Sequence, residues 1–211
     1  ILFQVENVLA ATAANWALGV PAEVIRVGLE TFAATLDKSP GRFNLLDICG
    51  ATVVVDYGHN TSSLQAMLET LAQFPQQRRL AVYSAAGDRR DCDMIEQGRL
   101  LGQAFDHVVL YEDHYLRGRA AGDISRLFDQ GLQQGGRVKS VKAVQGWDNA
   151  VAAILETIGP GDLVLLQADT IDGAVDIIRS HLVTQVAARE VNLREALRGS
   201  NGAAALAKPG Q

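Results

Sequence analysis

Over most of this chain, short runs of β-branched and other apolar residues alternate with segments of helical periodicity. A turn at Gly50 is all that separates the first two runs, which indicates an antiparallel hairpin. Every later run follows a helical segment, and strands that are joined through helices pair in parallel. The sequence therefore predicts an α/β fold, with a Rossmann-like, mostly parallel six-stranded sheet and helices on both faces. We expect its strands at residues 43–48, 52–55, 80–84, 108–111, 138–144 and 163–166.

The N-terminal segment has helical periodicity and precedes the first expected strand. Pro21 can open the second of two helices there, with Val24, Ile25, Leu29 and Phe32 facing inward. The last residues are small or polar and have little to bury, which is typical of a poorly ordered tail. We therefore expect three parts, which are a helical segment at residues 1–37, the sheet domain at residues 38–184, and a tail at residues 185–211.

Composition and charge exclude several classes of partner. The formal net charge is −5 and aromatic residues make up 6%, so neither electrostatics nor base stacking favours nucleic acid. No apolar stretch reaches the ~20 residues of a membrane span, and no signal peptide is visible. Cys49 and Cys92 are too few for a disulfide framework or a metal quartet. We expect a cytoplasmic protein that binds neither nucleic acid nor membrane and has no metal site of its own.

The stretch around Asp56 marks the expected functional edge of the sheet. A buried-strand pattern at Val53–Val55 ends in Asp56-Tyr57-Gly58-His59-Asn60, and hydroxyl side chains at residues 61–63 can cap the helix that follows. In open parallel sheets, ligands bind where strands end and helices begin, because helix N-termini attract anions such as phosphate. Polar turns follow three other strands as well. The four turns that should meet at this edge are 56–60, 87–91, 113–119 and 167–172.

These turns carry guanidinium groups beside carboxylates. Such a mixture suits an anionic, charged or zwitterionic substrate, because guanidinium forks hold carboxylate or phosphate. The alternative for any single turn is a set of solvated ion pairs. Glu112 and Asp113 are adjacent acids that suit a guanidinium group, although solvated carboxylates would have the same pattern. The arginines of the turns are Arg89, Arg90, Arg117 and Arg119.

Signatures of several other enzyme classes are missing from the sequence. There is no Gly-x-Ser-x-Gly nucleophile elbow, no His-Glu-x-x-His metal pair and no Gly-x-x-x-x-Gly-Lys-Ser/Thr phosphate loop. No Gly-x-Gly-x-x-Gly follows the first strands, which disfavours a dehydrogenase. A non-catalytic nucleotide- or ligand-binding module with a Rossmann-like fold stays open as an alternative to an enzyme.

The run Asp56 to Asn60, preceded by Pro40-Gly41-Arg42, resembles the C-terminal domain of the Mur ligase family. That family includes the muramyl peptide ligases, folylpolyglutamate synthetase and cyanophycin synthetase. Residues 112–119 resemble the cyanophycin synthetase branch, and residues 5–21 resemble the end of the central, ATPase domain of the family. Thr61 stands where the family usually has proline. The resemblance implies an ATP-dependent ligase that joins a carboxylate to an amine through an acyl phosphate.

The same resemblance implies roles for the residues of the four turns. Arg42, Asp56 and Tyr57 are expected to face the nucleotide. His59 and Asn60 are the catalytic candidates beside them. The residues expected to bind the incoming amino acid or dipeptide are Gly87, Asp88, Arg89, Asp113, His114, Arg117, Arg119 and Asp169.

ATP and Mg²⁺ are the cofactors that the resemblance implies, bound mainly by a central domain that precedes this one in the family. The implied partners are an amino acid or dipeptide, a polypeptide acceptor and the rest of the ligase chain, and a homo-oligomer stays open. The chain starts at Ile1 without a helix cap or a start methionine, so we interpret it as part of a longer protein or as a processed chain. By itself it is expected not to catalyse ligation.

Overall fold

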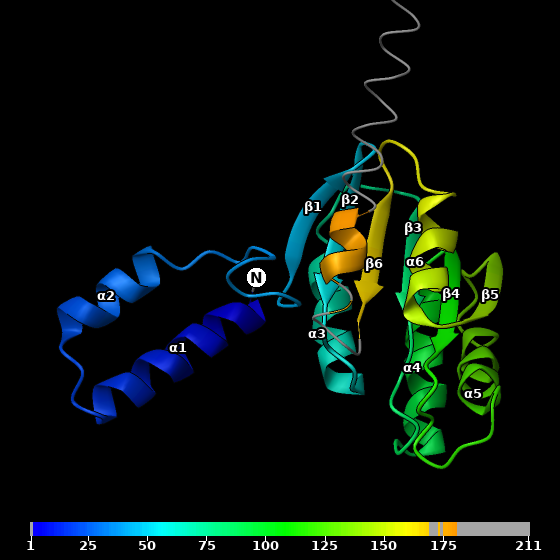
Figure 1. Ribbon diagram of the computed structural model, residues 1–211, viewed down its shortest axis with the longest axis horizontal. Coiled ribbons are helices and arrows are strands. Elements are labelled where there is room, and N and C mark those ends of the chain that lie inside the picture. The colour runs from blue at the N-terminus through cyan, green and yellow to red at the C-terminus, as the bar shows by residue number, and fades with distance from the viewer. Residues whose placement is uncertain (1, 169–172, 174, 181–211) are drawn as a thin grey trace, which may run out of the picture.

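The computed structural model describes residues 2–168, 173 and 175–180 (Figure 1). All six strands form one sheet in the order β1-β2-β6-β3-β4-β5. β1 and β2 pair antiparallel, and every other pair is parallel. The predicted hairpin and the predicted mostly parallel sheet are therefore confirmed. The strands are β1 (Asn44–Ile48), β2 (Ala51–Asp56), β3 (Arg79–Tyr83), β4 (His107–Glu112), β5 (Ser140–Gln145) and β6 (Leu163–Gln167).

The β1–β2 hairpin closes through the two residues Cys49 and Gly50. Both have positive φ angles, 56° and 78°, as a type I′ turn requires. The Gly50 amide donates to the Asp47 side chain at 3.0 Å, which fixes the turn. This tight connection sets the register that brings Asp56, at the end of β2, beside the segment that leads into β1.

Helices cover both faces of the sheet, as the alternating pattern predicts (Figure 1). Successive residues of each central strand point to opposite faces, so that Val54 packs under one layer and Val53 and Val55 under the other. One layer consists of α3 (Thr61–Leu71), α4 (Asp91–Ala104) and α5 (Asp123–Leu132). The other consists of α6 (Trp147–Leu155) and the helical residues 175–180. The last expected helix was to reach residue 182, and its ends lie outside the described residues.

α4 and α5 approach so closely that backbone meets backbone. Gly98 and Gly102 of α4 face Gly131 of α5 and Gly135 just beyond it. A Cβ atom on Gly131 would overlap the carbonyl oxygen of Ile95. The pair of helices therefore depends on the absence of side chains at this contact. Because α4 follows β3 and α5 follows β4, their spacing also sets the distance between the loops at the ends of those strands.

The N-terminal helices α1 (Leu2–Ala17) and α2 (Ala22–Glu30) extend away from the sheet (Figure 1). Both helices were predicted, but the expected inward orientation is wrong for Val24 and Leu29 of α2 and for Phe32 beyond its end. These side chains are 58%, 42% and 57% exposed, because no element of the described chain covers them, whereas Ile25 is partly buried. α1 touches the sheet domain through Phe3, whose ring lies 6.0 Å from that of Phe43.

The division into parts at residues 37 and 184 stays a prediction, and residues 185–211 lie outside the described part of the chain. Within that part, no helix has both the length and the apolar character needed to cross a membrane.

Asp106 anchors the edge of the sheet opposite the polar turns. Its buried carboxylate accepts hydrogen bonds from the Arg79 amide at 2.9 Å and the Arg137 guanidinium at 2.8 Å, and pairs with Lys139 at 3.0 Å. Burial alone would raise the pKa of Asp106, but these partners hold it well below its usual range. A depressed carboxyl pKa stabilises the fold above the unfolded-state value of about 3.9, and this contribution is lost as the pH falls further.

Replacing Asp106 by asparagine should therefore lower the free energy of unfolding by about 1.5 kcal/mol at pH 7. Urea denaturation at pH 7 and at pH 3 measures the effect. The difference from wild type should shrink at pH 3, because the Asp106 carboxyl is then largely protonated in the unfolded state while the folded protein still keeps it ionised. Glu156→Gln, on an exposed residue at the end of α6, is the control and should change stability by less than about 0.5 kcal/mol. An equal loss at both pH values would contradict an electrostatic role for Asp106.

Candidate functional site

The carboxyl ends of β2, β6, β3 and β4 lie at one edge of the sheet, and Gln167 connects them. Its side-chain oxygen accepts from the Ser84 amide at 3.0 Å, and its carbonyl accepts from the Tyr111 hydroxyl at 3.3 Å. The neighbouring Ala168 amide donates to the Asp56 carbonyl at 3.0 Å. Three of the four expected turns thus meet at this edge. The fourth, 167–172, is described only as far as Ala168, so Asp169 lies outside the described residues.

Asp56 holds the turn after β2 in shape. Its two carboxylate oxygens accept hydrogen bonds from the Gly58 amide at 2.6 Å and the Phe43 amide at 2.9 Å. Burial raises the pKa of Asp56 above its ordinary value, although both amides act in the opposite direction. The carboxylate therefore joins the turn to the segment before β1, and any contact with a nucleotide would be additional to this structural role.

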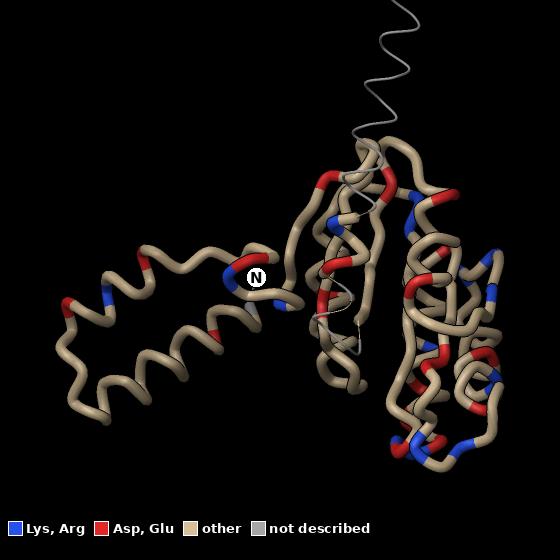
Figure 2. Tube along the Cα trace, viewed as in Figure 1, with Lys and Arg blue, Asp and Glu red and all other residues tan. Residues whose placement is uncertain are grey.

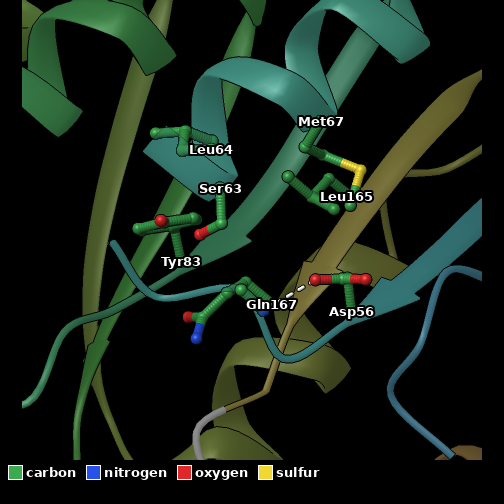
Figure 3. Close-up of a pocket in the computed structure, with 8 residues that line it drawn as sticks. Asp56, Ser63, Leu64, Met67, Tyr83, Leu165 and Gln167 are labelled. Carbon is green, nitrogen blue, oxygen red and sulfur yellow. Dashed lines mark hydrogen bonds between the residues drawn. The ribbon is translucent and has the colours of Figure 1, made fainter. Parts of the chain in front are cut away.

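A small cavity lies behind this turn (Figure 3). It is lined by Asp56, Ser63, Tyr83 and Gln167, and its volume of about 10 Å³ matches a single water molecule at most. The Gln167 side-chain nitrogen is buried and has no hydrogen-bond partner in the described chain. The cavity is a small void in the packing where β2, β3 and β6 meet, and it is too small for a ligand.

Tyr57 and His59 form the partly exposed side of the same turn. Their rings meet edge to face at 4.8 Å, and the Arg42 guanidinium lies 5.9 Å from the centre of the Tyr57 ring. His59 Nδ1 lies 3.3 Å from the Tyr57 carbonyl oxygen. A proton on Nδ1 would make this contact a hydrogen bond, which would leave Nε2 as the free nitrogen. We call the set Arg42, Asp56, Tyr57, His59 and Asn60 the β2 cluster.

Asn60 caps α3, where residues 61–63 were expected to do so. Its side-chain oxygen accepts from the Ser63 amide at 2.8 Å, and the Ser63 hydroxyl accepts from the Asn60 amide at 3.3 Å. This reciprocal pair is a capping box, with asparagine as the N-cap residue and serine at the third helical position. The catalytic candidate Asn60 therefore has its oxygen engaged, and its side-chain NH₂ group is what it can offer to a ligand.

The loops after β3 and β4 are joined by Arg119. Its guanidinium donates to the carbonyls of Gly87 and Arg89, both at 2.6 Å, and to the Asp91 carboxylate at 2.7 Å. Gly87 is packed so tightly that a Cβ atom there would overlap the Leu116 carbonyl oxygen. Arg119 was expected to bind substrate, but its fork is occupied by this backbone, so it positions the loops.

Arg117 and Asp88 form an ion pair at 2.9 Å across the same two loops, and both side chains are about half exposed. This pairing lowers the pKa of Asp88. Arg117 has a left-handed backbone conformation, with φ of 49°. Figure 2 shows the resulting mixture of acidic and basic segments at the lower end of the sheet domain. We call Gly87, Asp88, Arg89, Arg117 and Arg119 the β3–β4 cluster.

Glu112 neither binds a guanidinium group nor is solvated, which are the two possibilities that the sequence left open. It is 4% exposed, and its carboxylate accepts from the Gly122 amide at 2.7 Å and the Ser125 amide at 2.9 Å. It thus caps the start of α5 from within the sheet and is neither solvated nor available to a substrate. Asp113, the next residue, is partly exposed.

His114 and Asp113 border a wider cleft beside the N-terminus of α6. The cleft has a volume of about 440 Å³, and Gln145, Trp147 and Asp148 form its other side. No group of three or more His, Cys, Asp or Glu side chains in the described chain could hold a metal ion. The residues expected to bind substrate therefore lie in two places. His114 lines this cleft, and the β3–β4 cluster lies beside it. Asp113 lies between the two.

The sequence is similar to a known protein family and to known proteins. Residues 41–169 match the family model described as the glutamate ligase domain of Mur ligases. Cyanophycin synthetase from Nostoc sp. strain PCC 7120 is 31% identical over 177 residues, which cover 84% of this chain and 20% of that protein. The chain thus spans about one fifth of the length of this curated relative.

Two solved structures show the same fold. A murein peptide ligase from Psychrobacter arcticus superposes with a TM-score of 0.61 at 20% identity, covering 85% of this chain and 36% of that one. A MurF ligase from Thermotoga maritima in complex with ADP has a TM-score of 0.57 at 19% identity, covering 86% and 39%.

Proposed function

Because this chain belongs to the Mur ligase family, through the C-terminal domain of that family, we propose that it is part of an ATP-dependent acid–amino-acid ligase of the cyanophycin synthetase type. In this proposal, the domain closes over ATP that is bound mainly by another part of the ligase, which also holds Mg²⁺. It positions an incoming amino acid or dipeptide for attack on an activated carboxylate of a polypeptide. The observation that carries the proposal is the gathering of the β2 and β3–β4 clusters at one edge of a sheet with this family's fold.

The β2 cluster suits the phosphate end of a nucleotide. Arg42 is exposed, the Asn60 NH₂ group is not used by the helix cap, and one nitrogen of His59 can face outward. The Arg42 and Asn60 groups are cationic or N–H donors, which stabilise the negative charge that develops during phosphoryl and acyl transfer. The outward nitrogen of His59 is unprotonated in the tautomer that donates to Tyr57, so it can accept a proton from a reacting group. When bound, ATP supplies the phosphoryl group that activates the carboxylate. Asp56 keeps these donors in place by fixing the turn.

The β3–β4 cluster suits the incoming amine substrate. Arg117 and Asp88 are exposed enough to exchange partners with a zwitterion, while Arg119 and Gly87 hold the loops at a fixed spacing. Asp113 and His114 extend this surface towards the cleft at α6. Separate clusters for nucleotide and amine are what a reaction between two bound substrates needs, because each must be oriented independently.

The test of this function uses the complete polypeptide that contains this chain, with Mg-ATP and a short Asp–Arg polymer as primer. Phosphate release is followed while arginine, a β-Asp–Arg dipeptide, aspartate and glutamate are offered separately. Stimulation by arginine or by the dipeptide is expected. Stimulation by glutamate alone would assign the protein to another branch of the family, and no stimulation by any of them would favour a binding module without ligase activity.

A further inference from the structure

Arg42 is an exposed cation on a short segment that is otherwise buried. Gly41, Phe43 and Asn44 on either side of it are all buried. The Arg42 guanidinium forms no ion pair with a residue of the described chain, and it lies 5.9 Å from the centre of the Tyr57 ring. The direction of this side chain is therefore set mainly by the backbone that carries it.

That backbone has a conformation that needs support from its surroundings. Gly41 and Phe43 have positive φ angles, 68° and 54°. For a bulky residue such as phenylalanine this left-handed conformation is strained, and strained residues persist only where neighbouring groups fix them. The Phe43 amide donates to the Asp56 carboxylate at 2.9 Å. The Tyr57 amide donates to the Gly41 carbonyl at 2.9 Å. The turn after β2 thus fixes one side of the segment.

Asn44, the first residue of β1, fixes the other side, although it was not among the residues expected to act in the site. Its side chain lies in the interior, with the residue 1% exposed. The side-chain oxygen accepts a hydrogen bond from the Gly41 amide at 2.7 Å. The side-chain nitrogen donates to the carbonyls of Ala34 at 3.2 Å and Ser39 at 2.9 Å. One buried amide group therefore fixes three points of the segment before β1, which requires an acceptor and two donors on the same side chain.

We propose that Asn44 is a positioning residue for nucleotide binding and acts through Arg42. This inference rests on the proposed ligase function, in which Arg42 faces ATP. Loss of the Asn44 side chain would release the Gly41 amide, while Asp56 would still fix Phe43. The guanidinium could then point in several directions, and ATP would have to order it on binding, which lowers affinity. Because this ordering is complete once ATP is bound, the effect should fall on the KM for ATP and not on kcat.

Steady-state kinetics of the complete ligase test this proposal, with ATP as the varied substrate and an accepted amino acid at saturation. Asn44→Ala should raise the KM for ATP about tenfold and leave kcat within about threefold of wild type. Arg42→Ala should raise the KM for ATP by at least about tenfold. The double variant should have a KM for ATP within about twofold of that of Arg42→Ala, because Asn44 has no further effect once the guanidinium is absent.

Two further Asn44 variants separate positioning from a loss of folding. Asn44→Asp keeps the acceptor for the Gly41 amide and loses both donated hydrogen bonds, so it should raise the KM for ATP less than Asn44→Ala does. If Asn44→Ala does not fold, Asn44→Ser takes its place with the same expected direction, because its hydroxyl can still serve one of the three backbone groups.

Asp106→Asn is the matched control for a loss of stability alone. It removes buried hydrogen bonds at the opposite edge of the sheet and should leave the KM for ATP within about twofold of wild type. The inference is wrong if Asn44→Ala raises the KM for ATP no more than Asp106→Asn does. It is also wrong if the effects of Asn44→Ala and Arg42→Ala simply multiply in the double variant. Both outcomes would leave the ligase function in place.

A wild-type protein without ATP-dependent turnover would instead overturn the proposed function. In that event, calorimetric titration of Mg-ATP into the same polypeptide decides about Asn44. Weaker binding to Asn44→Ala than to wild type, with no further loss when this change is added to Arg42→Ala, would support the inference. Equal binding to wild type and Asn44→Ala, or no binding at all, would overturn it.

Discussion

Replacing His59 by alanine is expected to lower the kcat of the complete ligase by about 100-fold, with less than a threefold change in the KM for the incoming amino acid. The side chain lies on the partly exposed side of the turn after β2, and its Nδ1 atom is 3.3 Å from the Tyr57 carbonyl oxygen. When Nδ1 carries the proton, Nε2 is unprotonated and can accept a proton from the attacking amine. Loss of such a positioned general base costs roughly 10²–10⁴ in rate. Phosphate release at saturating substrate concentrations measures the effect.

His107 provides the matched control. It begins β4 at the opposite edge of the sheet, where its Nδ1 contacts the Ser140 hydroxyl at 2.8 Å. His107→Ala should leave kcat within about twofold of wild type, because it removes the same ring far from the proposed site. His59→Gln supplies an amide that can form hydrogen bonds but cannot take up a proton, so it should recover little of the lost rate. A kcat for His59→Ala within threefold of wild type would show that the imidazole has no part in the reaction.

The fold could be predicted because local and global signals agree in the central strands. Val53, Val54 and Val55 favour a strand by themselves, and all three are buried because helices cover both faces of the sheet. The orientation of α2 could not be predicted in the same way. An apolar stripe indicates that a helix face is suited to burial, but the stripe does not indicate what covers it, and Val24 of α2 is 58% exposed here.

The location of the candidate site could be predicted from the sequence, but the hydrogen-bond partners of its residues could not. Parallel strands bring their carboxyl ends to one edge, so the convergence of the polar turns follows from topology. Side-chain partners depend on atoms distant in sequence. The sequence around Glu112 does not indicate that its carboxylate accepts hydrogen bonds from the amides of Gly122 and Ser125. The sequence around Arg119 likewise does not indicate that its guanidinium donates to the Gly87 carbonyl.

Replacing Gly131 by alanine should lower the free energy of unfolding by about 3 kcal/mol, at the upper end of the usual cost of overpacking. The new Cβ would overlap the Ile95 carbonyl oxygen and lie 2.7 Å from the Arg99 amide nitrogen. Both are backbone atoms of α4, so no side chain can rotate away and the helices must separate. Alanine favours helix by roughly 1 kcal/mol over glycine, and this gain is too small to offset the overlap. Chemical denaturation should show a lower midpoint with an unchanged slope.

Gly159 tests whether the effect is specific to the helix contact. An added Cβ at Gly159 would meet nothing within 4 Å, so Gly159→Ala should change stability by less than about 0.5 kcal/mol.

Gly98 allows a second test of the same contact, because its Cα would lie 2.9 Å from the Cβ added to Gly131. Once α4 and α5 have separated for one substitution, the other has room. The double variant Gly98→Ala with Gly131→Ala should therefore lose less stability than the sum of the single losses. Strict additivity, or a loss for Gly131→Ala no larger than for Gly159→Ala, would rule out direct backbone contact between these helices.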